Sequence, residues 1–135
     1  QKDSKPIPTA QAFQHRDWNH FPAVVERDTS NEVVALGDVH GGYKRLVKLL
    51  STSGLIAPDS QSATGYSWTG GARTLVCTGD LIDKGDHSLE VLELMMALEP
   101  QAHASGGEVI VTLGNHEAEF LANPFGDVAA FRLGL

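Results

Sequence analysis

The chain is poor in cysteine, in basic residues and in long apolar segments, and each shortage excludes a class of protein. Its 135 residues include a single cysteine, Cys77, so no disulfide can form within the chain. No apolar run is long enough to cross a bilayer, so we expect no membrane association through a spanning segment. Its 10 lysines and arginines are outnumbered by 17 aspartates and glutamates, for a net charge of −7. This balance disfavours nucleic acid as a partner, but an anionic substrate stays open because bound divalent cations reverse the local charge.

Two polar segments show neither a helical nor a strand period. The first, residues 1–31, contains three prolines, so we expect an irregular N-terminal arm whose anchoring aromatic residues are Phe13, Trp18 and Phe21. The second, residues 58–71, is rich in serine, threonine and glycine and is expected to be a loop.

Between and beyond these segments, three short apolar runs alternate with two helical patterns. The runs are Val33–Leu36, Thr74–Cys77 and Val109–Leu113, and because they are apolar throughout we expect strands covered on both faces. Apolar residues recur with a helical period in Tyr43–Leu50 and Ser88–Leu98. This order predicts an α/β fold in which right-handed βαβ units form a largely parallel sheet.

Each predicted strand leads directly into a glycine-rich polar cluster. The clusters are residues 37–42 (GDVHGG), 79–85 (GDLIDKG) and 114–117 (GNHE). The carboxyl ends of parallel strands share one edge of a sheet, where ligands bind, so we expect the three clusters to converge. A single Gly-Asp or a single histidine is most often structural, whereas three such clusters in this order indicate a ligand site.

The polar residues of the clusters are suitable ligands for divalent metals. Asp38 and His40 are two residues apart in an extended segment, so their side chains leave from the same side. Asp80 adds a second carboxylate, which can bridge two cations, and Asn115 adds a neutral carbonyl oxygen. A mixed set of oxygen and nitrogen donors fits Mn, Fe or Zn better than Ca or a thiolate-bound metal.

The three clusters resemble the motifs of the phosphoprotein phosphatase family within the calcineurin-like metallophosphoesterases. Those motifs are Gly-Asp-x-His-Gly, Gly-Asp-x-x-Asp-Arg-Gly and Gly-Asn-His-Glu, and the likeness extends over residues 33–122. Trp68 with Gly70 and Gly71, together with the pair at 106–107, is most similar to the Shewanella-like bacterial phosphatases. The resemblance implies that residues 32–135 form the N-terminal half of the metallophosphoesterase α/β sandwich, with the active site at the carboxyl ends of the strands.

The resemblance implies a centre of two divalent metal ions. Asp38 and His40 would bind the first metal, Asp80 would bridge both, and Asn115 would bind the second. The implied nucleophile is a hydroxide that bridges the two metals. It is available at neutral pH because two cations lower the pKa of water.

Other matching residues would act on the substrate or support the site. His116 would be the general acid that protonates the leaving oxygen, and Asp83 would hold its ring in place. Lys84 and Asn115 would contact the phosphate, and Glu117 would support the loop rather than react.

The sequence departs from the family pattern at two points. Lys84 stands where the usual motif has arginine, so phosphate should still be bound but with a looser orientation. The family completes its metal site with later histidines, whereas His116 is the last histidine here and Arg132 lies in no family motif. We therefore expect the C-terminal half of the catalytic domain to be missing from this chain. On that basis we predict at most one weak metal site and little turnover.

The implied activity is that of a metal-dependent phosphoric monoester hydrolase, a serine/threonine or tyrosine protein phosphatase. Its partner would be a phosphorylated protein or a small phosphate ester. A dinucleoside polyphosphate hydrolase of the same superfamily is the alternative enzyme, but its second motif usually lacks the acidic partner that Asp83 provides, and its third usually ends in aspartate where this chain has Glu117. A truncated, inactive metal-binding module also stays open.

The sequence does not settle the compartment or the oligomeric state. The chain starts at Gln1 rather than methionine, which fits signal-peptide removal, an engineered start or proteolysis. The resemblance to bacterial enzymes leaves the bacterial cytoplasm open and, if a signal peptide preceded Gln1, the periplasm or secretion.

Overall fold

The computed structural model describes residues 19, 23–24 and 26–124, in a chain that divides into two compact units. The first unit comprises residues 1–30 and the second residues 31–135. The described residues of the first unit form no helix or strand, and its expected aromatic anchors lie outside the described residues. The clusters identified in the sequence all belong to the second unit.

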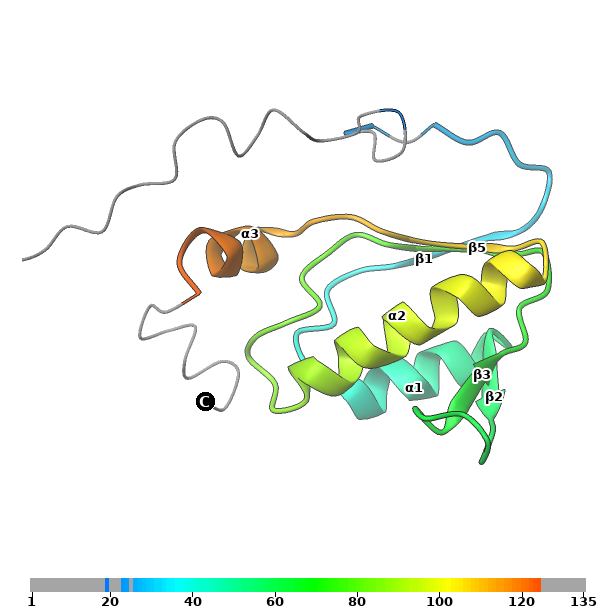
Figure 1. Ribbon diagram of the computed structural model, residues 1–135, viewed down its shortest axis with the longest axis horizontal. Helices are drawn as coiled ribbons and strands as arrows, with labels where there is room; N and C mark the ends of the chain where they lie inside the picture. Colours follow the sequence, from blue (N-terminus) through cyan, green and yellow to red (C-terminus); the bar gives the residue numbers. More distant parts are fainter. Residues whose placement is uncertain (1–18, 20–22, 25, 125–135) are drawn as a thin grey trace, which may run out of the picture. The chain divides into compact units, whose positions relative to one another are not determined.

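A three-stranded parallel sheet forms one layer of the second unit (Figure 1), and its strands lie in the order β1-β4-β5. The strands are β1 (Val33–Leu36), β4 (Thr74–Cys77) and β5 (Glu108–Val111). The last residues of all three strands pair in one row, Leu36 with Cys77 and Cys77 with Val111. The predicted α/β fold with a parallel sheet is confirmed, and this row brings the three clusters to one edge.

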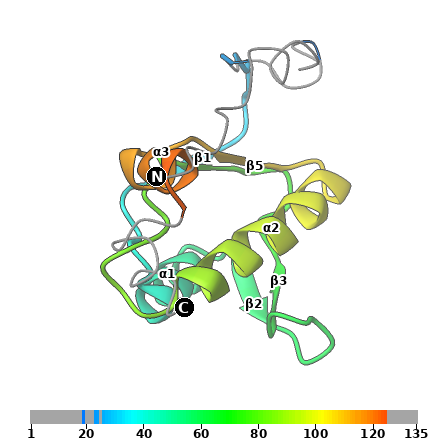
Figure 2. The ribbon, with the colours of Figure 1, turned by 60° about the vertical axis from the view of Figure 1, so that its left-hand side comes forward.

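Two helices pack on the same face of this sheet (Figures 1 and 2). They are α1 (Tyr43–Thr52) and α2 (Ser88–Ala104), and each turns a line of leucines or valines toward the strands. The largest fully buried side chains are Leu46, Leu50, Leu55, Leu75, Leu94, Leu98, Val91 and Cys77. Burying one such aliphatic side chain contributes about 1.5–3 kcal/mol, so this layer is the main source of stability.

The opposite face of the sheet is less covered than the sequence led us to expect. Burial along β1 alternates between exposed and half-buried residues, and Val33 and Val111 are 50% and 44% exposed. Only the central strand β4 is buried along most of its length. The expectation of strands covered on both faces is therefore wrong for the outer strands, because both α1 and α2 lie on one side.

A short antiparallel hairpin overlaps the segment expected to be a polar loop, residues 58–71. Its strands are β2 (Ile56–Pro58) and β3 (Tyr66–Trp68), with Ile56 paired to Trp68. The Trp68 ring is buried and its Nε1 donates to the carbonyl oxygen of Gly71 at 3.0 Å. Strands of three residues are too short for an alternating pattern to be recognised in a sequence.

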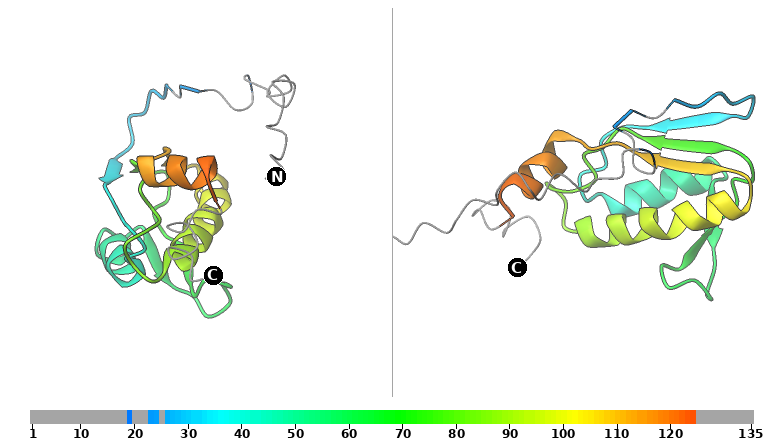
Figure 3. Two further views of the ribbon diagram at one scale, coloured as in Figure 1. Left: turned by 90° about the vertical axis from the view of Figure 1, so that its left-hand side faces the viewer. Right: turned by 45° about the horizontal axis from the view of Figure 1, so that its top comes forward.

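Two helical segments exceed the sequence prediction. Helix α2 continues through Pro100 to Ala104, although proline cannot donate to the carbonyl four residues earlier. That carbonyl belongs to Met96, whose side chain is 71% exposed, so this turn of the helix faces water. Helix α3 (Asn115–Ala122) was not predicted. It follows β5 at the edge where the strands end (Figure 3).

Candidate metal centre

Backbone hydrogen bonds join the first two clusters. The amides of Val39 and His40 both donate to the carbonyl oxygen of Asp80, at 3.1 and 2.9 Å, and Gly41 donates to Leu81 at 2.8 Å. The backbone at position 85 lies so close to the first cluster that only glycine fits, because a Cβ there would lie 2.5 Å from the carbonyl oxygen of His40. The convergence predicted from parallel-strand topology is thus present.

The Glu117 carboxylate ties the third cluster to the second. It accepts hydrogen bonds from four backbone amides at 2.7–3.1 Å, those of Asp80, Leu81, Ile82 and Gly114. A carboxylate with several backbone donors forms charge-assisted bonds that are stronger than neutral ones. Glu117 therefore holds the loop after β4 against the start of α3, in the supporting role that the sequence suggested.

The backbone at this edge is strained. Four described non-glycine residues have positive φ, and all belong to the clusters: His40 (48°), Asp80 (53°), Asp83 (80°) and Lys84 (64°). Such left-handed conformations cost roughly 1–3 kcal/mol each and persist where the surrounding structure enforces them, as at functional sites. The hydrogen bonds around Glu117 are part of that enforcement.

The hydrogen bonds of His40 define its tautomer. Its Nδ1 lies 3.3 Å from the carbonyl oxygen of Ile82, which can only accept, so Nδ1 carries the hydrogen. Its Nε2 lies 3.0 Å from the Lys84 ammonium, which can only donate. Nε2 is therefore unprotonated, as metal binding by histidine requires, and its lone pair accepts from Lys84 in this structure.

Three side chains bring possible ligand atoms together at this edge. His40, Asp80 and His116 offer atoms that all lie within 4.8 Å of one another. The two imidazole rings meet edge to face, with centroids 4.8 Å apart and an interplanar angle of 80°. Two nitrogens and a carboxylate suit Mn, Fe or Zn. The donors present thus fit a divalent metal.

The other predicted ligands lie at the margin of this group. The Asp38 carboxylate is 63% exposed and one of its oxygens lies 3.4 Å from His40 Nε2. Asn115 is exposed as the first residue of α3. His116, which the sequence assigned to acid catalysis, lies within the group. Its involvement depends on α3, which was not predicted.

A buried carboxylate orients His116. Asp83 is 6% exposed, and its Oδ2 accepts a hydrogen bond from His116 Nδ1 at 2.5 Å. Its Oδ1 accepts from the amide of Lys84 at 2.9 Å. With Nδ1 bound to Asp83, only Nε2 of His116 is left for a leaving group or a metal. The predicted pairing of these two side chains is present.

Cys77 lies outside this chemistry. The thiol is fully buried in β4, and burial raises its pKa above the usual range, with Glu117 and Asp38 as lesser causes. A buried neutral thiol in a strand is the role that its isolation in the sequence suggested.

The chain belongs to the calcineurin-like phosphoesterase family, which residues 32–133 match. It is 35% identical over 85 residues to Shewanella-like protein phosphatase 2 of Arabidopsis thaliana, covering 63% of this chain and 20% of that protein. It is 38% identical over 87 residues to the symmetrical bis(5'-nucleosyl)-tetraphosphatase of Cronobacter sakazakii, covering 64% of this chain and 24% of the enzyme.

Solved structures agree with this assignment. The cold-active protein-tyrosine phosphatase of a psychrophilic Shewanella species superposes with a TM-score of 0.61 and 35% sequence identity. The match covers 77% of this chain and 31% of that structure. The chain thus spans between a fifth and a quarter of the length of these curated relatives. Among the described residues, no helix has the length and apolarity needed to cross a membrane.

Proposed function

We propose that this chain provides one side of the active centre of a metal-dependent phosphoric monoester hydrolase that acts on phosphorylated proteins. The observation that carries the proposal is the pair of His116 and Asp83 beside the ligand atoms of His40 and Asp80. A proton donor next to a metal-binding edge suits hydrolysis of a phosphate ester whose leaving group needs a proton.

In this proposal the metals are held by the residues that the sequence assigned. Asp38, His40, Asp80 and Asn115 would hold two divalent ions, which when bound neutralise phosphate charge and lower the pKa of water. The strained loops around His40 and Asp80 fix these donors before a ligand arrives. Since Glu117 holds the loop in place, little rearrangement of the backbone is needed on binding, although the Lys84 ammonium must leave His40 Nε2.

Two further side chains would act on the substrate itself. His116 would deliver a proton from Nε2 to the leaving oxygen, because Nδ1 is engaged by Asp83. The Lys84 ammonium lies beside His40 at the same edge and would attract the phosphate as a point charge. Lys84 also lacks the planar geometry of arginine, so orientation of the phosphate depends more on Asn115 and the metals.

Relatives of two kinds support two substrate classes. The matched phosphatases favour a phosphoprotein, and the tetraphosphatases favour a dinucleoside polyphosphate. Asp83 and Glu117 favour the phosphatase, as the sequence suggested. The full-length protein, assayed with Mn, should therefore hydrolyse a phosphotyrosine or phosphoserine peptide with a higher kcat/KM than diadenosine tetraphosphate. The reverse order would support the nucleotide hydrolase instead.

The 135-residue chain alone should be a poor enzyme. With His116 kept as the proton donor, Asp38, His40 and Asp80 can serve one metal, whereas the second has only Asn115 and a share of Asp80. A neutral amide with one shared carboxylate competes poorly with water for a divalent ion. Para-nitrophenyl phosphate assays with Mn should show little turnover by this chain, and robust turnover by a clean monomer would refute the donor count.

A further inference from the structure

The described part of the second unit carries most of its positive charge in one place. Five lysines and arginines lie in residues 31–124: Lys44, Arg45, Lys48, Arg73 and Lys84. Three belong to α1, which has no acidic residue. The Arg73 guanidinium is bound by backbone carbonyls of neighbouring loops. For a chain of net charge −7, helix α1 is thus an unusually basic surface.

Lys44, Arg45 and Lys48, here termed the basic ridge, occupy one side of α1. At about 100° per residue these positions lie within an arc of roughly 100°. Leu46 and Leu50, at 1% and 2% exposure, point the other way into the core. All three basic side chains are exposed, and none forms an ion pair or hydrogen bond with another described residue. Their charge is therefore available to a partner.

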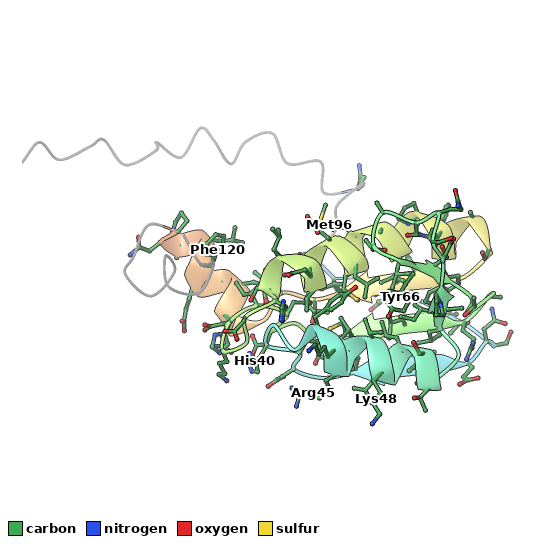
Figure 4. All side chains as sticks on the ribbon, turned by 90° about the horizontal axis from the view of Figure 1, so that it is seen from below. His40, Arg45, Lys48, Tyr66, Met96 and Phe120 are labelled. Carbon is green, nitrogen blue, oxygen red and sulfur yellow. The ribbon has the colours of Figure 1, made fainter. Side chains whose placement is uncertain are left out.

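The ridge begins at the metal-binding edge. Helix α1 starts at Tyr43, three residues after His40. The Arg45 guanidinium lies over the intervening backbone, with Nη2 3.5 Å from the point that a Cβ at Gly42 would occupy. Figure 4 shows Arg45 and Lys48 projecting outward from α1, one after the other from the end at which His40 lies. A chain leaving the site in this direction would meet the ridge.

Resting on the proposed function, we propose that the basic ridge binds acidic residues that flank the phosphorylated residue of a protein substrate. A helix of 10 residues is about 15 Å long, and an extended peptide rises about 3.3 Å per residue. Acidic side chains roughly two to four positions from the phosphorylated residue would thus lie along the ridge. A small phosphate ester has no such flanks and gains nothing from it.

The test uses the full-length protein with Mn and two phosphopeptides that differ only in their flanks, one with aspartates and glutamates and the other with asparagines and glutamines. Para-nitrophenyl phosphate provides the reference rate. Exposed charge pairs are individually weak and screened by salt. Three of them should give about a tenfold preference in kcat/KM for the acidic peptide, mostly through KM, and it should decline as salt is raised.

Two triple variants separate charge from shape. The variant Lys44→Gln, Arg45→Gln, Lys48→Gln should lose the preference, and the control Lys44→Arg, Arg45→Lys, Lys48→Arg should keep it. Equal rates on both peptides, or a preference that survives in the glutamine variant, would overturn the inference. Hydrolysis of the peptides would still uphold the proposed function in that case. A glutamine variant impaired only on diadenosine tetraphosphate would also overturn the inference. If the unaltered protein hydrolysed neither the phosphopeptides nor para-nitrophenyl phosphate, the proposed function would be refuted together with this inference.

Discussion

Nδ1 of His116 lies 2.5 Å from a carboxylate oxygen of Asp83, and this contact joins the first turn of α3 to the loop after β4. The residues are 33 positions apart in the chain, yet the pairing fixes which ring nitrogen of His116 is free. Because the His116 ring offers a nitrogen within 4.8 Å of ligand atoms of His40 and Asp80, His116 can serve either as a proton donor or as a metal ligand. The two roles predict different results for a variant that lacks the His116 side chain.

We expect His116→Asn to slow hydrolysis of an alkyl phosphate by a factor of about 10²–10⁴ and hydrolysis of para-nitrophenyl phosphate far less. The nitrophenolate leaves without a proton, so an acid matters little for it. Asp83→Asn should impair the same step by about tenfold, as for other partners that orient a histidine. The measurement is kcat/KM on both esters in the full-length protein. Equal losses on both, accompanied by loss of bound metal, would instead make His116 a ligand.

Glu117→Gln should destabilise the 135-residue chain by about 1–3 kcal/mol. The glutamine amide has one acceptor oxygen and presents hydrogens to amides that now share a carboxylate. Urea unfolding compares this variant with Glu93→Gln, which removes the same charge from an exposed position on α2. If both variants unfold at the same urea concentration, Glu117 does not hold the loop.

Two glycines of the clusters should respond differently to alanine. A Cβ at Gly114 would lie 2.1 Å from Asp80 Oδ1 and 2.3 Å from the Asp80 amide, whereas one at Gly37 meets nothing within 4 Å. Gly114→Ala should therefore displace Asp80 and cost about 1–3 kcal/mol, and Gly37→Ala should be tolerated. Thermal unfolding of both variants tests this. If both variants lost similar stability, the contact between a Cβ at position 114 and Asp80 would not be the reason for the loss.

Lys84 should affect phosphate binding through charge alone. In the full-length protein, Lys84→Ala should raise both KM and the inhibition constant for free phosphate, whereas Lys84→Arg should retain activity because it keeps the charge. An alanine variant with unchanged phosphate inhibition would place Lys84 outside the substrate site, as a partner of His40 only.

The parts of the fold that were predictable depend on local sequence. The apolar runs at 33–36 and 74–77 gave strands with the expected ends. The third strand ends two residues before the predicted Leu113, because pairing with β4 stops at Cys77 opposite Val111. Helix α3 had a recognisable signal in the glutamate three residues after Gly114.

The site was predictable in its location but not in its detail. Parallel topology alone brings Asp38, Asp80 and Asn115 to one edge. Three of the four amide hydrogen bonds to Glu117 and the tautomer of His40 depend on contacts between residues more than 30 positions apart, which no local pattern encodes. The same holds for the open face of the sheet, since the apolar character of β1 does not reveal which face is covered.

The proposed metal centre is tested most directly by adding substoichiometric Mn to the isotopically labelled 135-residue chain and recording the broadening of its amide resonances. Paramagnetic broadening reports weak sites as well as strong ones and locates them. We expect the strongest broadening at residues 38–42, 79–85 and 114–118, and its loss in Asp80→Asn. Broadening centred on other acidic residues, or unchanged in Asp80→Asn, would contradict a metal centre at this edge.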